Sequence, residues 1–148
     1  MFWFSRARRA RLFDTARLKR AIEAAERQTS GEIMVSVSPT FLGSVERAAR
    51  RAFDRLEVSR TRDRNGILFF VVPGRRAFVV LGDEGIHARV GQAFWEAVVA
   101  AVTPKLRAGD MTGGLEDGIA EVGHALALHF PYDPVMDQNE LPDDPEIR

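Results

Sequence analysis

"RNGILFFVVPGRRAFVVLGDEG", residues 64–85, contains the segment that decides the fold. Residues 67–72 form an unbroken apolar run rich in β-branched and aromatic side chains, which is typical of a strand buried on both faces. The pair Asn65-Gly66 favours a turn before this run, and Pro73-Gly74 favours a tight turn after it. Residues 75–82 are therefore predicted to pair back on the first strand as a hairpin.

Helices and one further strand are predicted on either side of the hairpin. The strand is indicated by alternating apolar residues that end at a proline, and the helices by apolar residues at three- and four-residue spacing. The helices are predicted over residues 14–28, with Asp14 as the N-cap, 44–56, with Ser44 as the N-cap, 90–102, ending before Pro104, and 115–129; the strand is predicted over residues 32–39. Residues 106–114 are predicted to be a loop, and residues 131–148 an irregular tail.

This order of elements predicts an α/β protein with a small mixed sheet. Because the central apolar run must be covered on both sides, we expect helices on both faces of the sheet. A length of 148 residues is typical of a single domain. We divide it into a basic and aromatic N-terminal segment (residues 1–12), the α/β domain (residues 13–131) and an acidic, proline-rich tail (residues 132–148).

Composition narrows the classes of function. The formal net charge is zero, which argues against a dedicated nucleic-acid-binding protein. There is no cysteine, so disulfides, zinc–thiolate sites and thiol catalysis are excluded. No signal peptide and no apolar stretch long enough for a membrane span is visible, and a cytoplasmic protein is the expectation.

Charge is distributed unevenly between the two ends of the chain. Residues 1–20 carry seven Arg and Lys against Asp14, and residues 131–148 carry six Asp and Glu against Arg148. The ends could attract each other or be independent solvated tails, and the sequence favours tails. A protein partner could use either end. The segment Phe2 to Arg11 could also touch an anionic membrane surface, but folding of its aromatic residues onto the domain is the favoured interpretation.

Acidic residues cluster in the loops at the ends of the predicted hairpin. Asp63 and Asn65 precede its first strand and Asp83 and Glu84 follow its second, so all four are expected at one end of the hairpin. Asp110, in the later glycine-flanked loop, could join them. Calcium prefers oxygen ligands from carboxylates and carbonyls, so these residues are candidate ligands of a Ca²⁺ ion. The alternative is that they cap helices and face water.

A catalytic role would need additional groups at the same place. Arg64 could neutralise the charge of a bound phosphate, and His87 could donate a proton or contact the phosphate. Asp83 or a metal-bound water would then be the nucleophile of a phosphate-ester hydrolase. Glu32, at the start of a strand, either orients a loop or is solvated. No catalytic residue is identified, and a binding protein is favoured over an enzyme.

Four stretches of the sequence together resemble the TPM domain family, which occurs in thylakoid-lumen, photosystem II repair and acetylcholine-receptor auxiliary proteins. They are "AIEAAERQTSGEIMVSV", "RNGILFFVVPGRRAFVVLGDEGI", "TPKLRAGDMTGGLEDGI" and "FPYDPVMDQNELPDD". The resemblance covers residues 12–144 and is greatest to short, stand-alone bacterial members.

This resemblance implies an α/β/α sandwich with a pocket at one end of a mixed sheet. It also implies Ca²⁺ binding, seen in some members, or a weak acid phosphatase activity, credited to others. Two departures matter: many members have Asp-Asn-Gly where this chain has Arg64-Asn65-Gly66, and an aromatic residue between glycines where it has Asp83-Glu84. From the acidic loops and the resemblance together, we expect an accessory module that binds Ca²⁺, with a metal-dependent phosphatase as the alternative.

Overall fold

The computed structural model of the chain describes residues 5–39, 42–135 and 139–148. Phe2, Trp3 and Phe4, for which the sequence favours folding onto the domain over a contact with a membrane surface, lie outside these residues. The helices are α1 (Arg6–Arg11), α2 (Thr15–Glu26), α3 (Val45–Arg55), α4 (Glu84–Val90), α5 (Gln92–Arg107) and α6 (Met111–His129). The strands are β1 (Glu32–Val37), β2 (Gly66–Val72), β3 (Ala77–Gly82) and β4 (Glu146–Ile147), and single 3₁₀ turns occur at Val58–Arg60 and Pro73–Arg75.

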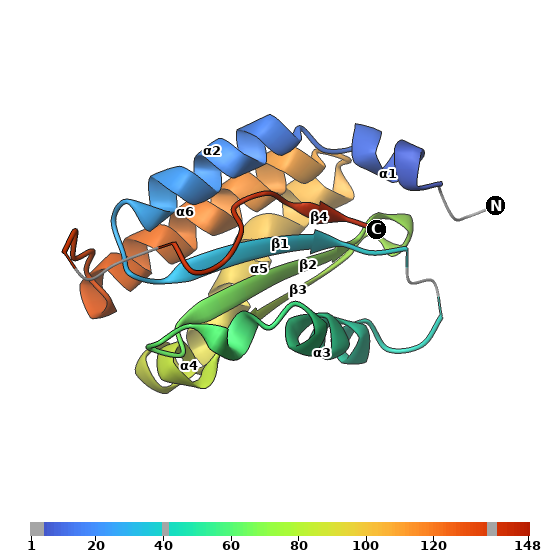
Figure 1. The fold of residues 1–148 in the computed structure, drawn as a ribbon. Coiled ribbons are helices and arrows are strands. Elements are labelled where there is room, and N and C mark those ends of the chain that lie inside the picture. Colours follow the sequence, from blue (N-terminus) through green and yellow to red (C-terminus); the bar gives the residue numbers. More distant parts are fainter. Residues whose placement is uncertain (1–4, 40–41, 136–138) are drawn as a thin grey trace.

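The four strands form one mixed sheet in the order β3-β2-β1-β4. The predicted hairpin is confirmed, because β2 and β3 are antiparallel with Ile67 opposite Gly82 and Val72 opposite Ala77. β1 lies parallel to β2, with Glu32 beside Gly66. Parallel neighbours need a crossover connection, and α3 provides it (Figure 1).

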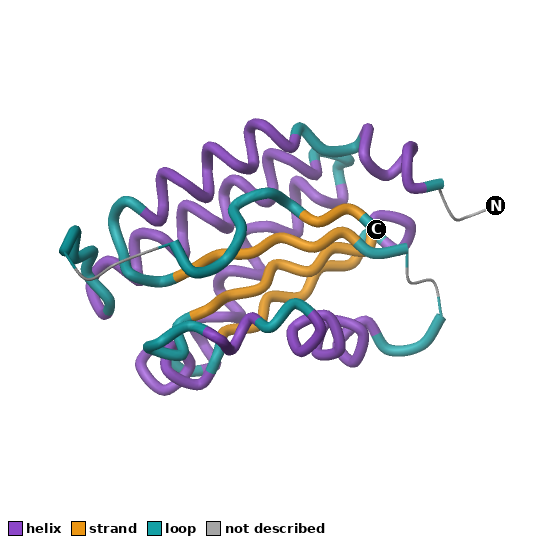
Figure 2. The backbone as a smooth tube through the Cα atoms, in the orientation of Figure 1, coloured by secondary structure: helices purple, strands orange, loops and turns teal. Residues whose placement is uncertain are grey.

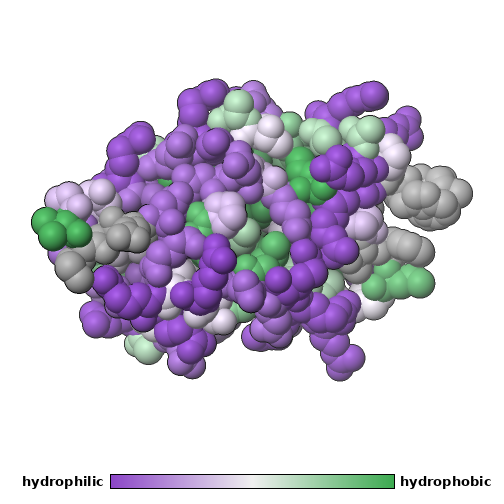
Figure 3. All heavy atoms as spheres, viewed as in Figure 1, coloured by the Kyte–Doolittle hydropathy of each residue, from purple (hydrophilic) through white to green (hydrophobic). Residues whose placement is uncertain are grey.

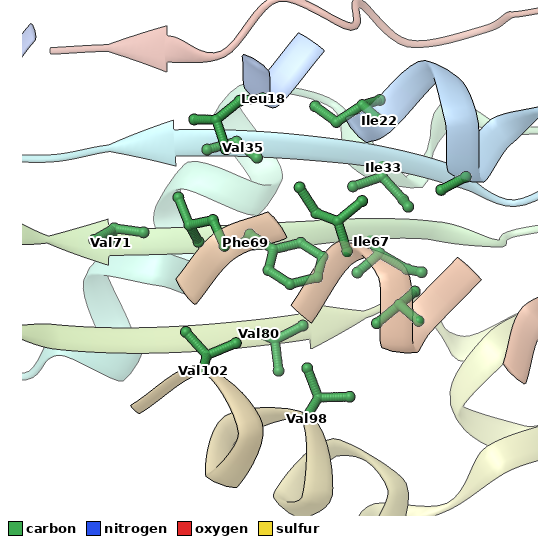
Figure 4. Packing of buried hydrophobic residues seen from close by; sticks show 14 of the residues in the cluster. Leu18, Ile22, Ile33, Val35, Ile67, Phe69, Val71, Val80, Val98 and Val102 are labelled. Atoms are coloured by element: carbon green, nitrogen blue, oxygen red, sulfur yellow. The ribbon is translucent and has the colours of Figure 1, made fainter. Parts of the chain in front are cut away.

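Helices cover both faces of the sheet, as the apolar run of β2 required (Figure 2). Alternate residues of the strands, among them Ile33, Ile67 and Phe69, pack against α2, α5 and α6 (Figure 4). The opposite set, which includes Leu68 and Phe70, packs against α3. Every residue of β2 is buried, which places this strand at the centre of the core.

Several predicted helix boundaries are confirmed by their caps. The Asp14 side chain accepts a hydrogen bond from Arg17 N, and the Ser44 side chain accepts one from Arg47 N. These are the contacts that make Asp and Ser favourable N-caps, since they satisfy an otherwise free backbone donor.

Three sequence predictions about the second half were wrong. Residues 84–89 lie outside the predicted helices, but Glu84–Val90 form α4, because Asp83 caps this helix by accepting from Glu84 N. α5 does not end before Pro104 but runs through it to Arg107. Pro104 is exposed while Val102 and Leu106 are buried, so apolar packing outweighs the missing hydrogen bond at the solvent face.

The third wrong boundary concerns residues 106–114. α6 begins at Met111, because the Asp110 side chain accepts a hydrogen bond from Gly113 N and caps it. Gly113 and Gly114, predicted to lie in a loop, are inside the helix. A Cβ at Gly114 would be 3.1 Å from Val102 O, and one at Gly118, further along the helix, would be 2.6 Å from Val102 Cγ2. These glycines allow α6 to approach α5 closely.

The acidic C-terminal segment is part of the sheet and not an independent tail, which corrects a further prediction. Glu146–Ile147 pairs with β1, and Leu141 is 2% exposed against the face of the sheet that α3 covers. The two ends of the chain also meet: Arg6 Nε donates to Ile147 O at 2.8 Å, and Lys19 forms an ion pair with Asp144. The tail prediction failed because these contacts depend on tertiary packing.

The face of the molecule seen in Figure 3 is mostly hydrophilic, as expected when the apolar residues are buried between the sheet and its helices. Hydrophobic residues show only in separate small areas of this face. Among the described residues, no helix is both long and apolar enough to cross a membrane.

The packing of Leu141 gives a direct test of the C-terminal segment. Replacing Leu141 with Ala should lower the free energy of unfolding by about 2 kcal/mol or more, because a buried leucine is lost and a cavity remains. Urea unfolding of both proteins measures the difference. The matched control is Val135→Ala, since Val135 lies in the same segment but is 85% exposed, and it should change stability by about 0.5 kcal/mol or less. Equal unfolding curves for Leu141→Ala and wild type would mean that the segment does not contribute to the core.

Candidate functional site

Two loops meet at the end of the sheet where β2 begins and β3 ends. Gly85 N donates to Arg64 O at 3.0 Å, and Asp83 N donates to Gly66 O at 2.9 Å. A Cβ on Gly85 would lie 2.3 Å from Asp63 O, so only glycine allows this close approach. The structure therefore brings residues 63–65 and 83–85 together, and we call this place the hairpin corner.

An ion pair occupies the hairpin corner. Arg64 Nε and Nη2 donate to the two carboxylate oxygens of Asp83 at 2.7 and 3.0 Å, and Arg64 Nη1 is 3.2 Å from Glu84 Oε1. Asp83 Oδ1 also accepts from Glu84 N at 2.8 Å. Two-pronged arginine–carboxylate pairs are strong and geometrically fixed. The two departures from the family pattern, Arg64 and Asp83-Glu84, are thus partners of each other.

The other candidate ligands are placed differently. Asp63 pairs with its neighbour Arg62 at 3.2 Å. Asp110 caps α6, which begins at the opposite end of the sheet from the hairpin corner, so it does not join the other four. Among the described residues, no group of three or more Asp, Glu or His side chains has an arrangement that could hold a metal ion.

Asn65 is the predicted ligand with the most unusual surroundings. It is 1% exposed, and its Nδ2 donates to Ser30 O and Ser30 Oγ at 3.1 and 3.3 Å. Its Oδ1 is buried and has no hydrogen-bond partner. A buried oxygen without a partner is costly, and such atoms often mark a place where water or an ion binds.

His87 has a defined contact. Its Nδ1 accepts a hydrogen bond from Trp95 Nε1 at 3.1 Å. In this contact Nδ1 is the acceptor, and the indole N–H of Trp95 holds the His87 ring beside the start of α5. The phosphate-binding roles of Arg64 and His87 remain predictions.

A second acidic site lies where β1 begins, between the end of α2 and the C-terminal segment. It is a pocket of about 260 Å³, which we call the acidic pocket. Its lining consists of Glu23, Glu26, Arg27, Thr29, Ser30, Glu32, Tyr132, Asn139 and Asp143. Four of these nine side chains are carboxyl groups.

Hydrogen bonds hold the carboxyl groups of the acidic pocket in place. Glu26 Oε2 accepts from Ile33 N at 3.0 Å, and the Glu26 and Asp143 carboxyl groups are in hydrogen-bond contact. Glu32 Oε1 accepts from Glu140 N and Leu141 N at 2.5 and 2.8 Å. Glu32 therefore orients the C-terminal segment, which is the first of the two roles that its sequence position left open.

Burial changes the acidity of two of these groups. The pKa of Glu26 is raised to about 10, first by burial and then by the contact with Asp143, while the Ile33 N–H opposes the shift. The pKa of Glu32 is raised to about 7, mainly by burial, and the two backbone N–H groups that it accepts from oppose this. At neutral pH, Glu26 therefore holds a proton between two carboxyl groups.

Sequence reasoning did not find Glu26 or Asp143. One signal was present: Glu26 is an acidic residue near the end of a predicted helix, where the helix dipole disfavours negative charge. Asp143 had no local signal, because its place beside Glu26 depends on how the C-terminal segment packs.

Comparison with known proteins identifies the family. A profile described as the TPM domain matches residues 8–125. The BA42 protein of the psychrophilic bacterium Bizionia argentinensis is 35% identical, with a TM-score of 0.83 over 89% of this chain and 90% of that one. No curated protein matches the sequence.

Two more distant structures share the fold. The N-terminal domain of a protein from P. gingivalis is 21% identical, with a TM-score of 0.62 over 80% of this chain and 75% of that one. The N-terminal domain of cg2496 from Corynebacterium glutamicum is 15% identical, with a TM-score of 0.60 over 90% of this chain and 77% of that one. The profile match spans most of the mixed sheet and its helices, and the chain belongs to the TPM domain family.

Proposed function

We propose that the protein is an accessory binding module that holds a divalent cation, Ca²⁺ first of all, in the acidic pocket. The observation that carries this proposal is that Glu23, Glu26, Glu32 and Asp143 line one pocket of about 260 Å³. As the described side chains are placed, no three of them could hold an ion together, so binding requires these carboxyl groups to turn toward it. Ca²⁺ takes six to eight oxygen ligands in flexible geometry, from carboxylates, neutral oxygens and water. The hydroxyl and amide oxygens that also line the pocket add neutral donors of the same kind.

The carboxyl groups of the acidic pocket are better suited to bind a cation than those of the hairpin corner. Asp83 and Glu84 both face Arg64, and Asp63 faces Arg62, so the carboxylates of the corner already have cationic partners. In the acidic pocket, Glu26 instead contacts the carboxyl group of Asp143. A cation there would replace the proton between the two groups.

Two unsatisfied oxygens add support. Asp143 Oδ1 is buried without a partner, and so is Oδ1 of Asn65, whose amide group is bonded to the pocket residue Ser30. Asn65, which belongs to the sequence-predicted set, thus bonds directly to a residue that lines the acidic pocket. Binding requires the carboxyl groups to lose a proton and turn toward the ion, and Ca²⁺ tolerates such irregular sites.

The phosphatase alternative has less support. It requires a free nucleophile and a cationic group directed at the phosphate. Both oxygens of Asp83 are occupied by Arg64, and Arg64 is directed at Asp83. No contact among the described residues favours this activity, so we propose a binding function.

Calcium titration of wild type and Glu26→Gln tests the proposal. Gln keeps the size of Glu26, can accept from Ile33 N and can donate to Asp143, but supplies no charge. For wild type, Ca²⁺ at about 100 times its dissociation constant should stabilise the folded protein by about 2.7 kcal/mol, seen as a rise in Tm. We expect the Glu26→Gln protein to show no such rise.

The control for position is Asp83→Asn in the hairpin corner, which should leave the calcium response intact. A response that disappears with Asp83→Asn and persists in Glu26→Gln would place the cation at the corner and overturn the proposed site. The absence of any calcium effect on wild type, in Tm and in calorimetric heat, would overturn the function itself.

The raised pKa of Glu26 predicts how stability depends on pH without calcium. Because the folded-state pKa of about 10 lies above the ordinary 4.5, the protonated group stabilises the fold at low pH, and this contribution is lost as pH rises from 4.5 toward 10. Gln stays neutral at every pH. The free energy of unfolding of Glu26→Gln, measured with urea, should therefore rise relative to that of wild type by about 1 kcal/mol or more between about pH 5 and pH 8. The control is Glu121→Gln, because Glu121 is exposed and has no ion pair among the described residues; its free energy of unfolding should follow that of wild type at every pH. If the free energy of unfolding of Glu26→Gln also ran parallel to that of wild type, the result would contradict a buried, protonated Glu26.

A further inference from the structure

A groove follows the outer side of β3 from Phe78 to Gly82. It has a volume of about 760 Å³, and residues 78–82 of β3 form its floor. α3 contributes one wall, with Phe53, and α5 contributes the other, with Trp95 and Val99. Five consecutive residues of β3 line this groove. Because successive side chains of a strand point to opposite faces of the sheet, the groove must lie along the backbone edge of β3 and not over one face of the sheet.

Within the part of the chain that the structure describes, β3 is an edge strand, bonded to β2 on one side and to no strand on the other. Asp83 N donates to Gly66 O, and the register places Leu81 opposite Leu68 and Val79 opposite Phe70. In an antiparallel ladder, the backbone groups of alternate residues point to opposite sides. The N–H and C=O groups of the intervening residues, Phe78, Val80 and Gly82, therefore point into the groove.

These three residues have no backbone hydrogen bond beyond the sheet within the described chain. Proteins usually protect an edge strand with charged side chains, proline, a bulge or a covering segment. β3 has the sequence AFVVLG and pairs with β2 without a bulge. The other edge of the sheet is closed differently, because β4 of the same chain pairs with β1.

The walls decide what kind of segment fits. Phe78 and Val80 belong to the face that packs on α5, and Val79 and Leu81 to the face that packs on α3. An added strand would thus place alternate side chains against apolar surface on both sides. The edge of a second copy carries the same two helical walls, which would meet the walls of the first. A single extended segment fits this groove better.

Charge narrows the partner further. Glu46 and Asp54 on α3 and Glu96 on α5 line the groove, are exposed, and form no ion pair within the described chain. Arg50 is the wall residue of opposite charge among the groove-lining residues of α3 and α5. Three carboxylates against one guanidinium favour basic side chains on the ligand.

We propose that the groove along β3 binds an extended segment of a partner protein, with alternating apolar and basic residues, which adds a strand to the sheet. Backbone hydrogen bonds to Phe78, Val80 and Gly82 supply affinity, and the walls supply specificity for side chains. No residue lines both this groove and the acidic pocket, so this inference does not rest on the cation.

The experiment is a titration of the ¹⁵N-labelled full chain with a capped seven-residue peptide of alternating Lys and Val, and binding is followed by NMR. We expect saturable shifts at residues 78–82 and in the facing parts of α3 and α5, with slower hydrogen exchange at the amides of Phe78, Val80 and Gly82. The same peptide with its four central amides N-methylated should not bind, because it cannot form the added strand. A peptide with Glu in place of Lys should bind more weakly.

Matched charge variants separate the groove from general attraction. The double variant Glu46→Gln/Glu96→Gln should bind the peptide about three- to tenfold more weakly, because two exposed ion pairs with the peptide are lost. Glu57→Gln with Glu121→Gln changes the same residue types at exposed places outside the groove and should leave binding unchanged. Equal weakening by both pairs, shifts centred elsewhere, or no saturable binding would overturn the proposal. So would sedimentation that shows a dimer protected at β3, since a second copy would then occupy the edge.

Discussion

The structure depends on the burial of β2 on both faces. Its seven residues are apolar or glycine and all are buried, so each face needs its own cover. α2, α5 and α6 provide one cover. α3 covers the other face, and Leu141 of the C-terminal segment completes it. The acidic pocket follows from this arrangement, because the C-terminal segment must run past the start of β1 to reach its place over the sheet.

Local patterns predicted the centre of the fold and failed where tertiary contacts decide. The apolar run and its turns predicted the β2–β3 hairpin, and Asp14 and Ser44 predicted two helix starts. The prediction that α5 ends before Pro104 weighed one missing hydrogen bond but not the apolar face that continues to Leu106. The tail was read from its acids and prolines alone, whereas Glu32, Ser36 and Arg55 of the domain bind it.

The candidate sites show the same division. Hairpin pairing correctly placed Asp63 and Asn65 near Asp83 and Glu84, because register follows from the strand pattern. The sequence could also have indicated the ion pair, since Arg64 and Asp83 are oppositely charged and meet across the same hairpin end. The contact of Glu26 with Asp143 joins the end of a helix to the C-terminal segment, and no periodicity relates two such positions.

The two edges of the sheet are treated in opposite ways, and this separates the two proposed activities. The β1 edge is closed by β4, and the closing segment includes Asp143 and donates two backbone hydrogen bonds to the Glu32 carboxylate. A cation in the acidic pocket would therefore tie the C-terminal segment more firmly to the domain. The β3 edge lies on the other side of β2, and within the described parts of the chain its outward backbone groups have no hydrogen-bond partner, as the proposed added strand requires. Because the buried strand β2 and its neighbour β1 lie between the two edges, a cation at the closed edge would make no direct contact with the open one.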